Sequence, residues 1–227
     1  MAKVIRVEGT HNKDNASDGN TPLVLFTGFG DVKSKSVLDL VSILGSKESH
    51  YRTPMILDEL KRRALEFPVG VDPEALKPTT ESLNALSAIV KYLNSGSIPP
   101  EMKRLALDDL VDIGKKGAVD EINAGAVDGI IQFLNSENDP ELKVIAISRL
   151  GEVGRECPSS LLPAVVRGVV PQMKDPRLKG ECYWQLSEMA RCSSDLTRKN
   201  IEAIRDEPRN KTRLELMEKL FPRVSEK

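Results

Sequence analysis

The sequence predicts an all-α protein built from repeated pairs of helices. Three observations predict it: apolar residues recur at helical spacing from Val37 onward, one helical segment occurs three times, and helix-start signals precede its later copies. Apolar residues make up 40% of the 227 residues and aromatic residues only 4%. The core must therefore be built mainly from aliphatic side chains.

The repeated segment begins at Pro100, Pro140 and Pro176, so its copies are 40 and 36 residues apart. The copies read PEMKRLALDDLVDIG, PELKVIAISRLGEVG and PRLKGECYWQLSEMA. Their apolar positions coincide in four sets: Met102, Leu142 and Leu178; Ala106, Ala146 and Cys182; Leu110, Leu150 and Leu186; Ile113, Val153 and Met189. Matching positions of this kind predict equivalent places in a repeated fold.

A second helix precedes each copy of this segment. IVKYLNS from Ile89 matches IIQFLNS from Ile130, and VVPQM from Val169 continues the same apolar positions. Pro171 interrupts the third of these helices. A proline inside a helix removes a hydrogen bond and costs roughly 3 kcal/mol. We therefore expect that helix to be bent or short.

An earlier, more divergent unit is expected before the first clear repeat. Leu40, Val41 and Leu44 match the apolar positions of the leading helix. The spacing from Leu44 to Leu60 equals the spacing from Leu134 to Leu150. A linker with three prolines follows this unit at residues 67–80.

The chain divides into three predicted parts. Residues 1–36 are poor in helical pattern and predict a flexible or extended segment. Residues 37–195 form the repeat domain, and residues 196–227 supply one or two capping helices with a more polar face.

Helix boundaries are signalled by capping residues. Asp139 and Asp175 each precede a proline, which places an acceptor at the N-cap and proline at the first helical position. Gly114 and Gly154 fall near the predicted ends, where glycine tolerates a left-handed turn. One helix pair cannot bury its own apolar stripe, so the pairs must stack. The expected fold is a right-handed α-solenoid of about four units.

Residues 123–154, NAGAVDGIIQFLNSENDPELKVIAISRLGEVG, resemble an armadillo repeat. The DPELK start and the LGEVG ending also resemble HEAT repeats, and the two families grade into each other. The armadillo resemblance implies a short first helix at residues 117–122. Both resemblances imply a non-catalytic protein that binds proteins or peptides along a concave groove lined by the last helix of each unit.

The resemblance also points to groove positions. Peptide-binding armadillo domains place a Trp and an Asn on the groove helix, and the Trp position here holds Asp58, Asp108, Ser148 and Trp184. The Asn position holds Arg62, Asp112, Glu152 and Glu188, so the asparagine ladder is absent and the groove should be mostly acidic. The candidate groove residues are Asp108, Asp112, Ser148, Glu152, Trp184 and Glu188.

Two interpretations of this acidic row stay open. It attracts a basic segment of a partner, or it is the ordinary solvated face of the helices. Trp184 likewise fits a place between units or an exposed contact that stacks on a cation.

Composition argues against several classes of protein. The net charge of −1 is unlike the basic excess of a nucleic-acid binder. No apolar run reaches the roughly 18–20 residues that cross a bilayer, and the first 20 residues are too polar for a secretory signal. Three cysteines do not make a disulfide scaffold, so we expect a cytoplasmic protein, with the nucleus as the alternative.

Catalytic and metal signals are weak. His11 and His50 are the only histidines, and the cysteines lack metal-ligand spacing, so no catalytic residue, metal or cofactor is predicted. The predicted function is a non-catalytic adaptor or scaffold of undetermined oligomeric state. The first alternative is a structural subunit using apolar edges around Leu40 or residues 216–221. A HEAT-like alkylpurine DNA glycosylase ranks behind both, because phosphate would be repelled by an acidic groove.

Overall fold

The computed structural model describes residues 29–44, 52–67, 76–96, 98–158 and 160–192, and these residues form helices and turns with no strand among them. The predicted C-terminal capping helices at residues 196–227 lie outside this described part. The elements are α1 (Phe29–Ser34), α2 (Val37–Leu44), α3 (Thr53–Ala64), α4 (Thr80–Leu93), α5 (Pro100–Lys116), α6 (Asp120–Ser136), α7 (Pro140–Glu156), α8 (Leu162–Val169), the 3₁₀ helix η2 (Val170–Lys174) and α9 (Lys179–Cys192).

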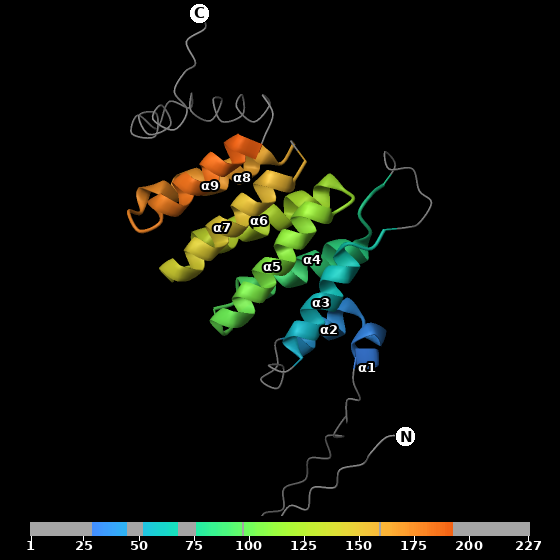
Figure 1. The fold of residues 1–227 in the computed structure, drawn as a ribbon. Helices are drawn as coiled ribbons and strands as arrows, with labels where there is room; N and C mark the ends of the chain where they lie inside the picture. Colours follow the sequence, from blue (N-terminus) through green and yellow to red (C-terminus); the bar gives the residue numbers. More distant parts are fainter. Residues whose placement is uncertain (1–28, 45–51, 68–75, 97, 159, 193–227) are drawn as a thin grey trace, which may run out of the picture.

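The helices pack in two layers. Helices α3, α5, α7 and α9 contact one another in that order, and α2, α4, α6 and α8 do the same in the second layer. Each helix from α3 to α8 also contacts the next helix along the chain, which joins the layers. Figure 1 shows this as a row that runs from the blue N-terminal helices to the orange α9.

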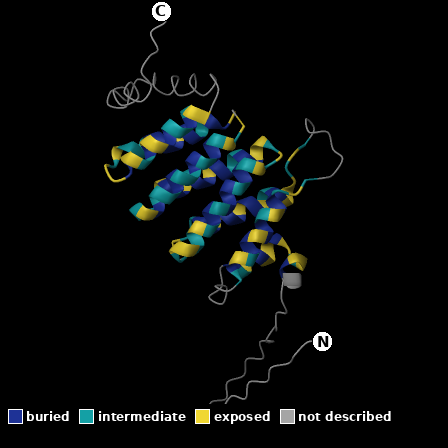
Figure 2. Cartoon of the chain, viewed as in Figure 1, coloured by how far each residue is buried: buried dark blue, intermediate teal, exposed yellow. Residues whose placement is uncertain are grey.

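The repeated apolar positions form the core between the layers. Leu110, Leu150 and Leu186 are each 0% exposed, as their alignment predicts. The small-residue set and the closing set are also fully buried: Ala106, Ala146, Cys182, Ile113, Val153 and Met189. Buried positions run through the middle of the row in Figure 2, so the sequence alignment and the spatial core agree.

The N-terminal unit follows the prediction in part. Leu40 and Leu60 are fully buried and Leu44 nearly so, but Val41 is 39% exposed. Val41 lies on α2, the first helix of its layer, and among the described helices α2 packs mainly against α3 and α4. Leu38 on the same short helix is 78% exposed.

Residues Phe29–Ser34, which lie within the predicted N-terminal segment, form helix α1. Arg63 on α3 explains this helix. Its Nη2 donates to the backbone carbonyls of Lys33 and Lys35, at 3.1 and 2.6 Å. These long-range bonds hold the C-terminal end of α1, and tertiary contacts of this kind override a weak local pattern. The remainder of the predicted N-terminal segment, residues 1–28, lies outside the described residues.

Pro171 breaks its helix as expected. Helix α8 ends at Val169, and residues Val170–Lys174 continue as the 3₁₀ helix η2. The prediction of a bent or short helix is therefore confirmed.

The two predicted caps behave differently. The Asp139 side chain accepts a hydrogen bond from the Glu141 backbone N–H at 2.9 Å, at the start of α7. Asp175 instead caps a turn by accepting from the Arg177 backbone N–H at 3.0 Å, and α9 begins at Lys179. The prediction that Asp175 is the N-cap and Pro176 the first helical residue is therefore wrong, because residues 176–178 form a turn before α9.

The turn before α6 corrects the expected armadillo first helix. Residues 117–119 form a turn, and α6 then runs without a break from Asp120 to Ser136. The segment at residues 117–122 is thus a turn joined to the start of a longer helix. This unit is built from two helices, α6 and α7.

Gly114 and Gly154 are packing positions rather than left-handed helix ends. Each lies inside its helix and is buried, two residues before the helix ends at Lys116 or Glu156. A Cβ on Gly114 would lie 3.3 Å from a methyl of Val153. The missing side chain allows α5 and α7 to approach closely.

Gly151 on α7 gives a direct test of this close packing. A Cβ there would lie 2.8 Å from Cβ of Gln185, an atom that cannot move without moving α9. Gly151→Ala should lower the free energy of unfolding by about 1–3 kcal/mol, as overpacking does. Urea unfolding monitored by circular dichroism measures the change.

Gly180 on α9 supplies the control, because a Cβ there meets nothing within 4 Å. Gly180→Ala should be neutral or stabilise the protein by up to about 1 kcal/mol. Equal effects of the two substitutions would contradict the packing of α7 on α9.

Candidate functional site

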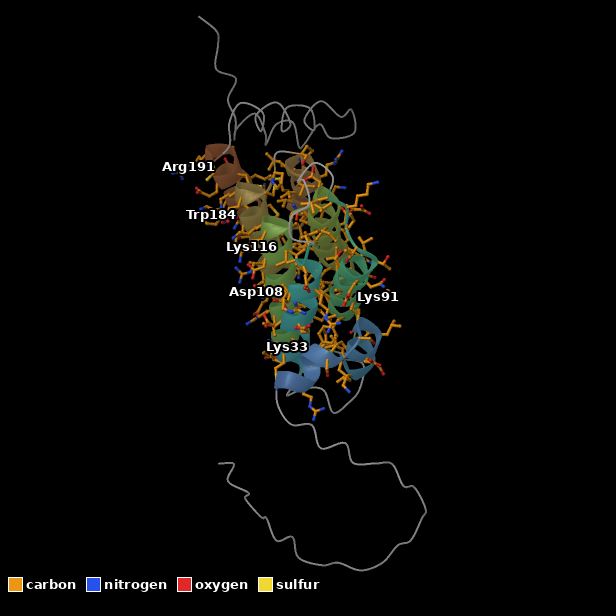
Figure 3. All side chains as sticks on the ribbon, turned by 90° about the vertical axis from the view of Figure 1, so that its right-hand side faces the viewer. Lys33, Lys91, Asp108, Lys116, Trp184 and Arg191 are labelled. Atoms are coloured by element: carbon orange, nitrogen blue, oxygen red, sulfur yellow. The ribbon has the colours of Figure 1, made fainter. Side chains whose placement is uncertain are left out.

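The six predicted groove residues lie on three helices of one layer. Asp108 and Asp112 are on α5, Ser148 and Glu152 are on α7, and Trp184 and Glu188 are on α9. Figure 3 shows Asp108, Lys116, Trp184 and Arg191 along one edge of the molecule and Lys91 of α4 on the opposite edge. We call the surface carried by α3, α5, α7 and α9 the odd-helix face.

Every carboxylate of the predicted row is paired with a cation of the same chain. Arg149 Nε lies 2.7 Å from Asp108 Oδ1, and Arg149 Nη1 donates to Glu152 at 3.0 Å. Lys115 Nζ lies 3.0 Å from the other Glu152 oxygen and 2.9 Å from Glu156. These contacts join α5 to α7.

The remaining two carboxylates are paired in the same way. Asp112 contacts Lys116 at 2.9 Å and Lys61 of α3 at 3.5 Å, while Glu188 contacts Arg191 at 2.6 Å. The acidic row expected from the sequence is therefore a mixed-charge row in the folded protein.

The pairing changes the acidity of these groups. Hydrogen bonding to Lys115 holds the pKa of Glu152 below its ordinary value, and Arg149 adds to the effect. Partial burial alone would raise the pKa of Asp112, but Lys116 and Lys61 lower it overall. Both side chains are consequently ionised near neutral pH.

A second polar position, missed by the sequence analysis, links successive helices. It lies one residue before the aligned leucines and holds Glu59, Asp109, Arg149 and Gln185. Asp109 contacts Lys61 on the preceding helix of the layer, and Arg149 contacts Asp108 on its own preceding helix. The sequence alignment could have indicated this position, because all four residues are polar and each directly precedes a fully buried leucine.

Gln185 completes the series between α7 and α9. It is fully buried, donates from Nε2 to Ser148 Oγ at 3.3 Å, and accepts from Arg155 at 2.7 Å. The same amide donates to Glu181 at 2.7 Å. Ser148 is thus placed at a helix junction as well as on the candidate face.

The junction between α3 and α5 contains a buried ion pair. Asp109 is 4% exposed, and its Oδ1 lies 2.8 Å from Lys61 Nζ. Its other oxygen has no hydrogen-bond partner. Burial raises the pKa of Asp109 to about 6 and exceeds the opposing effect of Lys61.

The α9 end of the face carries exposed aromatic side chains. Trp184 is 54% exposed and its neighbour Tyr183 is 37% exposed. The sequence left open whether Trp184 is buried between units or exposed. The structure shows that it is exposed.

A shallow cavity of about 250 Å³ lies where α3 ends and α4 begins, away from the predicted row. It is lined by Arg63, Glu66, Phe67, Thr79 and Glu81. The Arg63 guanidinium already donates to Glu59 and Glu81, at 2.8 and 3.0 Å, besides the two carbonyls at the end of α1. Arg63 therefore serves to join the first helices.

The remaining candidates for chemistry are histidines, cysteines and carboxylates that could ligate a metal or act in catalysis. No group of three or more candidate metal ligands occurs within the described residues, and His11 and His50 lie outside them. Burial raises the pKa of Cys157 to about 11 and that of Cys182 to about 12, so both thiols are protonated at neutral pH. Among the described helices, none is both long and apolar enough to cross a membrane.

Asp109→Asn should remove the part of the pH dependence of stability that comes from the Asp109 carboxyl. The folded state binds the Asp109 proton more tightly than the unfolded state, so its contribution to stability falls as pH rises from about 4 to about 6. Urea unfolding of the wild type across this range should show that fall relative to Asp109→Asn. Asp58→Asn, an exposed partner of the same lysine, is the control and should keep the wild-type slope. Parallel curves for Asp109→Asn and the wild type would contradict the buried environment of Asp109.

No protein-family model matches the chain, and no curated protein matches it in sequence. Solved structures similar to it include two crystal structures of engineered proteins from the Northeast Structural Genomics Consortium. One is 20% identical with a TM-score of 0.45, over 86% of this chain and 44% of that protein. The other is 17% identical with a TM-score of 0.40, over 85% of each chain. The chain spans less than half the length of the first engineered protein.

Proposed function

We propose that the protein is a non-catalytic binding module, an adaptor or scaffold that holds a protein segment on its odd-helix face. The single observation that carries the proposal is the exposed Trp184, on the same edge of the molecule as Asp108. A tryptophan with 54% of its surface in water is costly to leave uncovered, and tryptophan is enriched at binding hot spots.

The proposed architecture behind this function is a right-handed α-solenoid of about four armadillo- or HEAT-like units. Support comes from the two layers of helices and from the equivalent burial of Leu110, Leu150 and Leu186. The two-helix unit formed by α6 and α7 favours the HEAT-like variant. A stack of this kind presents one helix per unit to a ligand and needs little reordering when it binds.

The proposed ligand is a basic or amphipathic protein segment. Asp58 and Asp108 keep 63% and 47% of their side chains exposed, so they can attract a cation from solution. Trp184 would stack on a cationic or apolar side chain of the same segment. Carboxylates on such a face raise the rate of association and select positive partners.

The compartment proposed is the cytoplasm, with the nucleus as the alternative. Cys157, Cys182 and Cys192 are all free thiols, as is usual in a reducing compartment. The overall charge of −1 gives no support to a nucleic-acid partner.

A second candidate function is a structural subunit of a larger assembly. Leu38 and Val41 favour it, because α2 exposes both at the end of the row. Leu40, which the sequence suggested for such an interface, is fully buried and cannot supply it. Light scattering separates the two functions: a monodisperse monomer supports the binding module, and an obligate oligomer supports the subunit.

Trp184→Ala tests the binding module. Arginine- and lysine-rich peptides on an array identify a bound sequence, and calorimetry then measures its affinity for each variant. We expect Trp184→Ala to weaken binding at least about tenfold, as truncation of a hot-spot aromatic does.

Lys91→Ala is the matched control, because Lys91 is exposed on the opposite edge of the molecule. It should leave the affinity unchanged, and circular dichroism should show the same helical content in both variants. Binding that is equally strong in wild type and Trp184→Ala would contradict the proposed site.

A further inference from the structure

We propose that Arg149 is an internal competitor for the odd-helix face: its guanidinium occupies the place that an arginine of a bound partner would take. This inference rests on the proposed function and adds a restraint on the same site. It concerns one guanidinium and the two carboxylates that it bridges, Asp108 and Glu152.

The geometry shows that the space between two helices fits a guanidinium. Arg149 contacts Asp108 on α5 through Nε, at 2.7 Å, and Glu152 on α7 through Nη1, at 3.0 Å. A planar guanidinium with several donors can bridge two carboxylates, whereas a lysine ammonium is a compact point charge. The pair of carboxylates is therefore suited to arginine rather than lysine.

The three side chains are partly exposed, although the two closest atoms of the Arg149–Asp108 pair are buried. The side chains of Arg149, Asp108 and Glu152 are 37%, 47% and 29% exposed, so a ligand can reach all three. Although Arg149 Nε and Asp108 Oδ1 are close, neither atom makes a hydrogen bond. Both atoms are buried, so a guanidinium of the partner contacts this Asp108 oxygen only after the Arg149 side chain moves aside.

Glu152 keeps a second cation when Arg149 is displaced. Lys115 lies 3.0 Å from its other oxygen, so the junction between α5 and α7 does not lose all of its ion pairs. Displacement of Arg149 is thus compatible with an intact stack. The restraint makes weakly basic segments poor ligands, because they must displace a tethered arginine before they bind.

Arg149→Met tests the competition, because methionine keeps an unbranched apolar chain and removes every donor. The small probe is methylguanidinium, and backbone amide shifts of Asp108 and Glu152 in nuclear magnetic resonance report its binding to the full chain. Saturable shifts are expected in Arg149→Met and not in the wild type. Adding Asp108→Asn to the variant should abolish them.

The arginine-containing peptide from the array supplies a second readout. It should bind Arg149→Met about tenfold more tightly than the wild type, the change expected when one charge-assisted contact is released. Lys91→Met removes the same charge from the opposite edge and should change the affinity less than about twofold. If Arg149→Met does not fold, Arg149→Lys replaces it and should show a smaller gain, because one ammonium cannot bridge both carboxylates as well.

The results separate this inference from the proposed function. A peptide that binds the wild type through Trp184 but binds Arg149→Met no more tightly would overturn the role of Arg149 and leave the binding module standing. Methylguanidinium bound by Arg149→Met, with no peptide bound by any variant, would keep the guanidinium site and reject the binding module. Absence of shifts in a folded Arg149→Met would also overturn the inference.

Discussion

The structure depends on one constraint: each helix carries an apolar stripe that the helix paired with it cannot cover completely. Leu110, Leu150 and Leu186 occupy aligned positions on three helices, and contact with neighbouring helices buries each of them fully. Buried glycines such as Gly151 allow the neighbouring helices to approach closely enough to exclude water. The order of the helices and the position of the candidate face follow from this repeated packing.

The polar side of the same helices sets what the candidate face can do. Carboxylates of the row are paired with cations from their own or adjacent helices, so the face offers a mixed-charge surface to a partner. Exposed ion pairs of this kind add little stability, typically below about 1 kcal/mol each. In the proposed function their larger effect is on recognition, since a basic ligand would compete with Arg149 and Lys115 for the same oxygens.

The sequence predicted the burial of the aligned leucines, the break at Pro171 and the cap at Asp139, because each depends on residues close together in the chain. It missed α1, because that helix is held by Arg63 from α3, about thirty residues away. It also missed the pairing of the candidate carboxylates, since Arg149 and Asp108 are brought together only by stacking. Residue types at aligned positions showed which groups are polar, whereas their partners depend on how the helices pack.

Native-state hydrogen exchange of the full chain tests the central claim about stacking most directly. If the aligned leucines form one continuous core, amides of α5, α6 and α7 should exchange slowest and through one shared opening reaction, with protection falling toward α2 and α9. Separate opening reactions of similar free energy for the segments around Leu110 and Leu150 would show that the units do not share a core, and would contradict the account.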